Sequence, residues 1–215
     1  LKDLALVTDY WLAEFGLISH WPLDDAEDLS VYDAVTQKRG TLQGYSHWQP
    51  EIGRIDGALA FDGVDDYVRA RVPLNPEDGP FSVFAWLKGC VTGQTILAQD
   101  GGADWLALDL QLGHLKTNLS GLDAAAEVLQ AQTTTLSDDV WHHVGFTWDG
   151  AARALYVDGV EVASDTQPRL AGSDGDLLIG TGRNLGPNSF WYGLIDEVRI
   201  YRRALTGQDI NVLAH

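Results

Sequence analysis

Three tryptophans lie in stretches rich in Gly, Asp, Ser and Asn, and they are the first candidates for a binding site. Trp48 lies in Y-S-H-W-Q-P, Trp105 in G-G-A-D-W-L and Trp191 in N-S-F-W-Y-G. Indole rings in loops can stack on the apolar face of a sugar ring while nearby polar groups bond its hydroxyls. The sequence therefore predicts Trp105, Trp191 and Trp48 as ligand-binding residues, with packing at the edge of the core as the alternative for each.

A second chemical feature is the pair His142-His143, which suggests a transition-metal site. Adjacent residues of a regular strand point to opposite faces, so both imidazoles cannot hold one metal. The pair is therefore assigned to structure. Trp86, Trp141 and Trp148, which lie in β-like runs, are expected in the core, and so is Trp21.

Short apolar runs separated by Gly/Asp turns indicate an antiparallel, all-β chain. Residues 144–148 end at Asp149-Gly150, and the two apolar runs within 154–164 are separated by Asp158-Gly159. Asp-Gly tolerates the positive φ angles of a tight hairpin turn. Many such runs in one chain are typical of a sandwich or barrel.

Composition limits the class of protein and its partners. The 215 residues fit one all-β domain, and no run of about eighteen apolar residues exists, so no membrane insertion is expected. A net charge of −17 argues against nucleic acid and anionic membranes, which need a basic face. The acid excess serves solubility, or part of it binds cations. Cys90 is the only cysteine, so no internal disulfide can form.

The two ends of the chain differ from the middle. Residues 1–15 contain apolar residues near helical spacing and no Gly or Pro, which predicts a short helix or a linker from an upstream domain. Residues 16–215 are expected to form the β-domain. Residues 206–214 are expected to add a helical turn with Thr206 as its N-cap. The chain contains no Met and no visible signal peptide, so an export signal is expected outside it.

Six segments carry a family resemblance, in the order and spacing that the family shows. They are G-L-I-S-H-W-P-L-D (16–24), V-Y-D-A-V-T-Q-K-R-G-T-L (31–42), G-A-L-A-F-D-G-V-D-D-Y-V (57–68), F-S-V-F-A-W-L-K (81–88), W-H-H-V-G-F-T-W-D-G (141–150) and F-W-Y-G-L-I-D-E-V-R-I-Y-R-R-A-L (190–205). The chain resembles laminin-G-like domains of the concanavalin A-like lectin/glucanase superfamily. The resemblance implies a two-sheet antiparallel jelly-roll sandwich, here with a short N-terminal helix.

The resemblance also implies a structural calcium ion between the N-terminal Asp loop and the C-terminal strand. Calcium takes carboxylate and carbonyl oxygens, often from loops. Asp33 and Asp196 are the implied ligands, with carbonyls from residues 36–41, and Asp62 is a further candidate in F-D-G. The alternative for each aspartate is a turn residue that accepts backbone N–H groups. For the inward carboxylate of Asp196, an arginine such as Arg199 is the alternative partner to calcium.

Enzyme signatures of the superfamily are absent from the sequence. Relatives that hydrolyse glucans carry E-x-D-x-x-E, and jelly-roll lyases carry Q-x-H; neither pattern occurs here. Retaining glycosidases need two carboxyl groups about 5–5.5 Å apart on one face, which the sequence neighbours Asp196 and Glu197 do not offer.

The sequence thus predicts a non-catalytic, extracellular or cell-surface binding module of a larger multidomain chain. Its expected partner is a polysaccharide or other glycan, with calcium as the bound ion. The alternative is an adhesion or structural domain that binds a cell-surface protein. A glycan-active enzyme that uses scattered acids is the third possibility.

Overall fold

A computed structural model of the protein describes residues 16–25, 30–89, 91–121, 128–134 and 136–215. The expected helix over residues 1–15 and the single cysteine at position 90 lie outside these ranges. None of the helices in the described ranges is long and apolar enough to cross a membrane.

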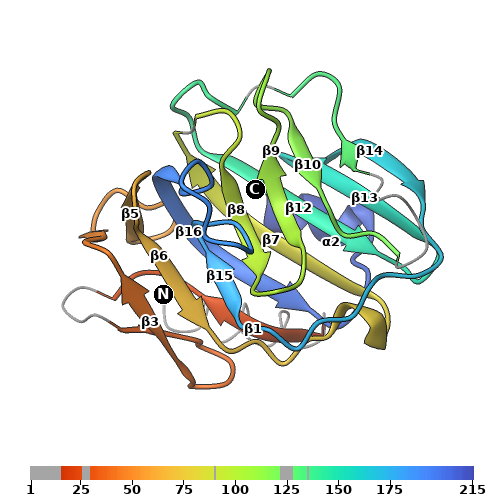
Figure 1. Cartoon of the computed structure of the whole chain (residues 1–215), viewed down its shortest axis with the longest axis horizontal. Helices are drawn as coiled ribbons and strands as arrows, with labels where there is room; N and C mark the ends of the chain where they lie inside the picture. Colours follow the sequence, from red (N-terminus) through yellow and green to blue (C-terminus); the bar gives the residue numbers. More distant parts are fainter. Residues whose placement is uncertain (1–15, 26–29, 90, 122–127, 135) are drawn as a thin grey trace.

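The described chain forms two antiparallel sheets that face each other, as the resemblance implied (Figure 1). The first sheet has the order β14-β13-β12-β7-β16-β5-β4, and β1 pairs with the remaining length of β16. Its strands are β1 (Leu17–Trp21), β4 (His47–Gln49), β5 (Ala58–Asp62), β7 (Phe81–Lys88), β12 (His142–Trp148), β13 (Ala152–Val157), β14 (Val160–Thr166) and β16 (Tyr192–Tyr201).

The second sheet has the order β11-β10-β9-β8-β15-β6-β3-β2. Its strands are β2 (Ser30–Tyr32), β3 (Arg39–Gln43), β6 (Tyr67–Ala70), β8 (Thr95–Gln99), β9 (Asp104–Leu108), β10 (Leu115–Thr117), β11 (Leu129–Gln130) and β15 (Leu177–Ile179). In Figure 1, β6, β15 and β8 of this sheet lie in front of β16, β7 and β12 of the first. Seven of the fourteen strand pairs in the described ranges join strands that are not consecutive in the chain, as in the Greek-key connectivity of sandwiches.

The two expected Asp-Gly turns are present and explain the register of the hairpins. Asp158 and Gly159 join β13 to β14 with φ angles of 49° and 80°. Both central residues of this turn therefore have positive φ, which matches the right-handed twist of the flanking strands. At the β12–β13 turn, Asp149 accepts the backbone N–H groups of Ala151 at 2.8 Å and Ala152 at 2.7 Å.

The main hydrophobic core fills the space between the sheets. The largest fully buried aromatic side chains include Trp21, Trp105, Trp191 and Phe81. A second cluster lies on the outer face of the first sheet, where Leu205 and Ile210 cover Phe84, Tyr156 and Tyr201 together with Ala154. Burying each large apolar side chain contributes about 1.5–3 kcal/mol, so the sandwich is held by packing across both faces of this sheet.

The described α-helix, α2 (Gly207–Leu213), lies at the C-terminal end. Thr206 is its N-cap, as expected: its hydroxyl accepts the N–H of Asp209, whose carboxylate in turn accepts the N–H of Thr206. This reciprocal capping satisfies two otherwise unpaired N–H groups. The helix thereby begins where the chain leaves β16 and places Ile210 on the sheet.

Candidate metal and ligand sites

Two of the three tryptophans expected to bind ligand are core residues. Trp105 and Trp191 are each 0% exposed. Trp105 lies on β9, a strand whose residues after Asp104 are all buried, and its ring centroid is 5.7 Å from that of Phe81. Trp191 precedes β16, and its backbone N–H donates to the carbonyl of Gly180 at 2.8 Å. The expectation that these rings reach solvent is wrong, because strands that border the polar loops turn both indoles into the sandwich.

Trp48 is in a different position. It lies on β4, at the edge of the first sheet, and is only partly buried while it packs against the main core. A ring at a sheet edge can present one face to solvent. Trp48 therefore remains a candidate ligand-binding residue, whereas Trp105 and Trp191 are buried out of reach of a ligand. The core expectation is confirmed for Trp21, which is 0% exposed, and for Trp86 and Trp148, which are both 5% exposed. Trp141 differs, because it is only partly buried.

Asp33 is fully buried, and its hydrogen bonds occupy both carboxylate oxygens. Oδ1 accepts the backbone N–H groups of His20 at 3.0 Å, Val35 at 2.9 Å and Thr36 at 3.2 Å. Oδ2 accepts the hydroxyl groups of Ser19 at 2.8 Å and Thr36 at 2.8 Å. Five donors leave no oxygen lone pair for a cation. These contacts fit the alternative of a turn residue better than that of a calcium ligand, and Asp33 anchors the loop of residues 33–38.

Asp62 belongs to a separate acidic group. Among the described residues, Asp62, Asp65 and Asp66 form the one group of three or more metal-ligating side chains whose ligand atoms lie within 4.8 Å of one another. Asp66 accepts the N–H groups of Tyr45 at 2.6 Å and Asp62 at 3.0 Å, and burial raises the pKa of its carboxyl although those bonds lower it. The Asp62 side chain also accepts the N–H of Val64 at 2.8 Å, as a turn residue does. The three predicted ligands thus do not form one site, because Asp62 groups with its own neighbours in the β5–β6 turn.

Asp196 retains a feature that fits a cation. It is 0% exposed, and its Oδ2 accepts the backbone N–H groups of Arg54 at 2.8 Å and Ile55 at 3.0 Å. Its Oδ1 is buried and has no hydrogen-bond partner. Burial raises the pKa of this carboxyl to about 7, the N–H of Ile55 opposes the rise, and the nearby charge of Asp24 adds to it. An orphaned buried carboxylate oxygen beside a second carboxylate is the arrangement that a cation relieves.

The sequence prediction did not include Asp24. Its Oδ1 accepts the N–H of Gly57 at 2.8 Å, so Asp24 and Asp196 fasten opposite ends of the loop of residues 54–57. Burial raises the pKa of Asp24 as well. The sequence signal for Asp24 was its place at the end of the 16–24 motif. There it follows β1, the strand that pairs with β16, which carries Asp196. That pairing is a long-range contact, which the sequence alone did not specify.

The two adjacent histidines lie in unrelated surroundings. His142 contacts Asp138 at 3.0 Å and Asp158 at 2.8 Å near the surface. The ring of His143 is buried, stacks on Phe84 with a centroid distance of 5.2 Å, and has a pKa lowered to about 3 by burial and, less strongly, by the charge of Arg199. The two imidazoles do not converge, as expected for neighbours on a strand.

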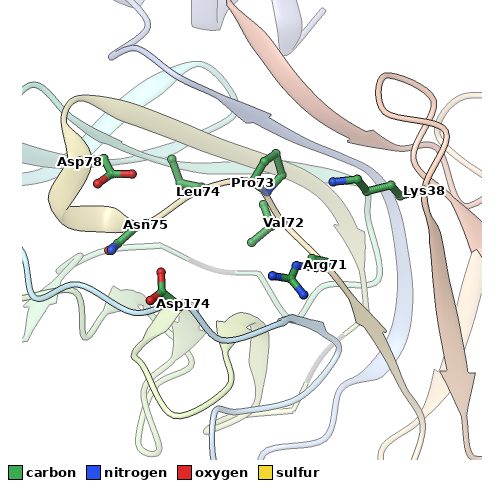
Figure 2. A pocket seen from close by; sticks show the side chains of 8 residues that line it. All are labelled: Lys38, Arg71, Val72, Pro73, Leu74, Asn75, Asp78 and Asp174. Carbon is green, nitrogen blue, oxygen red and sulfur yellow. The ribbon is translucent and has the colours of Figure 1, made fainter.

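A pocket of about 440 Å³ lies where the chain leaves β6 (Figure 2). It is lined by Lys38, Arg71, Val72, Pro73, Leu74, Asn75, Asp78 and Asp174. Figure 2 shows the two cationic side chains on one side of the pocket and Asn75, Asp78 and Asp174 on the opposite side. Pockets of this size accommodate small ligands such as one or two sugar units.

The sequence prediction missed this pocket because strand pairing creates it. Thr41 of β3 lies opposite Arg69 of β6 in an antiparallel pair. Lys38, just before β3, and Arg71, just after β6, therefore lie at the same end of the pair. The remaining wall comes from the loop before β15, more than one hundred residues later, where Asp174 lies. Lys38 and Arg71 are two of the 14 lysines and arginines of the chain, and nothing in the sequence joins them.

Residues 62–211 match the model of a laminin-G-like family, described as the concanavalin A-like lectin/glucanases superfamily. The chain belongs to this family. None of the curated proteins matches the sequence.

Solved structures share the family fold. Domain 4 of AbnA, a GH43 extracellular arabinanase from Geobacillus stearothermophilus in complex with arabinotriose, matches with a TM-score of 0.70 and 25% identity over 93% of this chain and 98% of that domain. The binding domain of Paraclostridial Mosquitocidal Protein 1 matches with a TM-score of 0.76 and 14% identity, over 93% of this chain and 52% of that one. Trypanosoma rangeli sialidase matches with a TM-score of 0.67 and 19% identity, over 93% and 33%. The chain spans about half of the toxin domain and a third of the sialidase, so these two matches report the fold alone.

Proposed function

We propose that this family member is a non-catalytic carbohydrate-binding module of a secreted or cell-surface multidomain protein. The observation that carries the proposal is the likeness to arabinanase domain 4, which the chain matches over nearly the whole domain and which is solved with an oligosaccharide. A pocket of sugar-ring size with both donors and acceptors supports it. The fold alone would not support a carbohydrate-binding function, since this architecture carries many functions.

Calcium is part of the proposal, at a site revised from the sequence prediction. Asp196 and Asp24, joined by carbonyl groups of the loop of residues 53–57, would hold the ion. The buried, unpartnered Oδ1 of Asp196 supports this set, and the fully bonded Asp33 does not belong to it. A bound divalent cation would neutralise the buried carboxylate of Asp196 and the half-buried carboxylate of Asp24, and would stabilise the loop against β16. In a chain with a single cysteine, such a link would take the place of a disulfide.

The decisive experiment is a binding screen of this chain on an array of neutral and acidic glycans, including arabinan oligosaccharides, with calcium and with EDTA. Saturable binding to a glycan supports the proposal, and loss of binding or of thermal stability in EDTA supports the calcium component. Reducing-sugar release and absorbance near 235 nm, followed with the same glycans, detect hydrolase and lyase products. Sustained product formation would show that the chain is an enzyme and would overturn the proposal of a non-catalytic module.

A protein-binding function is the second candidate. It rests on the family fold, which is shared by the botulinum neurotoxin serotype D binding domain with a TM-score of 0.71 and 16% identity over 93% of this chain and 51% of that one, and on the adhesion alternative from the sequence. Absence of glycan binding together with saturable, protease-sensitive binding to cell surfaces would select this candidate.

A further inference from the structure

Four charged side chains line the pocket without forming ion pairs. Lys38, Arg71, Asp78 and Asp174 are all exposed, and their side chains make no hydrogen bond or salt bridge with the part of the chain that the structure describes. The neighbouring Arg69 shows the contrast, because its guanidinium pairs with Asp100 at 2.5 Å and Asp176 at 3.5 Å. The pocket therefore holds free cations on one wall and free carboxylates on the other, as Figure 2 shows.

The acidic wall is fixed by buried amides. The Nε2 atom of Gln99, which is 1% exposed, donates to the carbonyls of Leu74 at 3.3 Å, Ser173 at 2.9 Å and Gly175 at 3.0 Å. Asn75 Oδ1 accepts the N–H of Ser173 at 3.0 Å, which ties the loop of Asp174 to the turn of Asp78. The two carboxylates thus lie on segments whose relative position is set before a ligand arrives, which lowers the entropy lost on binding.

The backbone of the cationic wall is fixed as well. The Asp33 N–H donates to the carbonyl of Lys38 at 2.9 Å, and the saturated Asp33 carboxylate holds the rest of this short loop. Arg71 directly follows β6, so its backbone continues a paired strand. Val72, Pro73 and Leu74 supply apolar surface between the two walls.

We propose that this pocket binds a carboxylate-bearing sugar, a uronic or sialic acid unit. The carboxylate would lie against Arg71 and Lys38, the hydroxyl groups would donate to Asp78, Asp174 and Asn75, and the apolar C–H face of the ring would contact Pro73. Arginine and lysine form charge-assisted bonds with carboxylates, about twice as strong as neutral ones. The inference rests on the proposed carbohydrate-binding function and names the ligand class for it.

The charge distribution also disfavours ligands that carry several anionic groups. A sulfated or phosphorylated unit carrying several anionic groups would place one of them against Asp78 and Asp174, and like charges repel at this range. A neutral sugar would leave both cations without a partner. One carboxylate together with several hydroxyl donors matches the two walls.

Isothermal titration calorimetry on the whole chain in calcium tests this with matched ligand pairs. The pairs are α-1,4-linked trigalacturonic acid with α-1,4-linked galactotriose, and 3′-sialyllactose with lactose. We expect one acidic ligand to bind about tenfold or more tightly than its neutral counterpart, the range of one charged hydrogen bond. Which pair shows the preference distinguishes uronic from sialic acid.

Three variants locate the preference. Arg71→Gln and Lys38→Gln each should remove most of the tenfold preference, and both are surface changes that leave stability nearly unaltered. Lys116→Gln is the matched control, since Lys116 on β10 does not line the pocket and its side chain has no charged partner among the residues that the structure describes. A preference that survives in the Arg71→Gln, Lys38→Gln double variant overturns the inference. Binding of neutral sugars alone, here or on the array, also overturns it but leaves the carbohydrate-binding function standing. Absence of binding to any glycan removes both.

Discussion

Asp196 provides the sharpest test of the proposed calcium site, because its buried carboxylate predicts opposite effects with and without the ion. Its pKa is about 7 in the folded protein and near 3.8 when exposed. Without calcium, the folded state holds the proton more tightly, so stability is fully present below pH 4 and is lost as pH rises through 7. The difference between the two pKa values corresponds to about 4 kcal/mol.

His143 gives the stability a pH dependence opposite to that of Asp196, so the assay must separate the two contributions. Its folded pKa of about 3 lies below the ordinary value of 6.5, so the stability that it contributes falls as pH drops through this range. Between pH 4 and 6.5 the two effects offset each other in the wild-type protein. Subtracting the profile of Asp196→Asn cancels the histidine contribution and leaves that of Asp196.

The assay is urea unfolding of both proteins in EDTA from pH 4 to 8, repeated at pH 8 with calcium. Relative to wild type, Asp196→Asn should become more stable by about 4 kcal/mol between pH 4 and 8, because the amide keeps an acceptor for the loop without a buried charge. Calcium at one hundred times its dissociation constant should add about 2.7 kcal/mol to wild type and much less to the variant. A constant difference across the pH range would refute the buried-charge argument, and an equal calcium response would remove Asp196 from the site.

The remaining predictions concern the core and the loop of residues 33–38. Trp105→Ala and Trp191→Ala should each lower the free energy of unfolding by about 3–5 kcal/mol in denaturant titration, as Trp148→Ala should, and a folded variant that has only lost ligand would contradict the core assignment. His143→Phe should keep the stacking on the sheet and flatten the loss of stability below pH 6, read as thermal midpoints against pH; an unchanged acid limb would contradict it. Asp33→Asn should weaken binding of acidic sugar and lower the thermal midpoint while the calcium-induced rise stays at the wild-type value, and a lost calcium response would return Asp33 to the metal site.

The sequence predicted the fold because the signals for strands and turns are local. Asp158-Gly159 needs only its own φ angles to form a hairpin, and Thr206 needs only residues three positions away to cap α2. The same locality explains the errors at Trp105 and Trp191. Their polar neighbours indicate loops, whereas the direction of each indole is set by the facing sheet, which a stretch of six residues does not contain.

The sequence singles out Asp33 and Asp196 as candidate ligands, and the partners that the structure gives them are distant in sequence. Asp33 accepts from Ser19 and His20 on β1, and Asp196 accepts from Arg54 and Ile55, 141 or more residues away. Spacing along the chain carries no information on such contacts. It can therefore identify a carboxylate that needs a partner, and only the fold decides whether that partner is a backbone amide or a cation.

The carboxylates of this strongly acidic chain fall into two groups, buried ones that hold loops and exposed ones that can contact a ligand. Buried aspartates fasten loops by accepting backbone N–H groups: Asp33 holds the turn that carries Lys38, and Asp196 holds the segment that carries Arg54, whose guanidinium lies 4.4 Å from the ring centroid of Trp86. Exposed carboxylates such as Asp174 remain free to meet a ligand. Because each fastening carboxylate is enclosed, its loss shifts the loop that it holds. Substitutions at Asp33 should therefore alter binding through the position of Lys38, whereas substitutions of the charged pocket residues should alter it through charge.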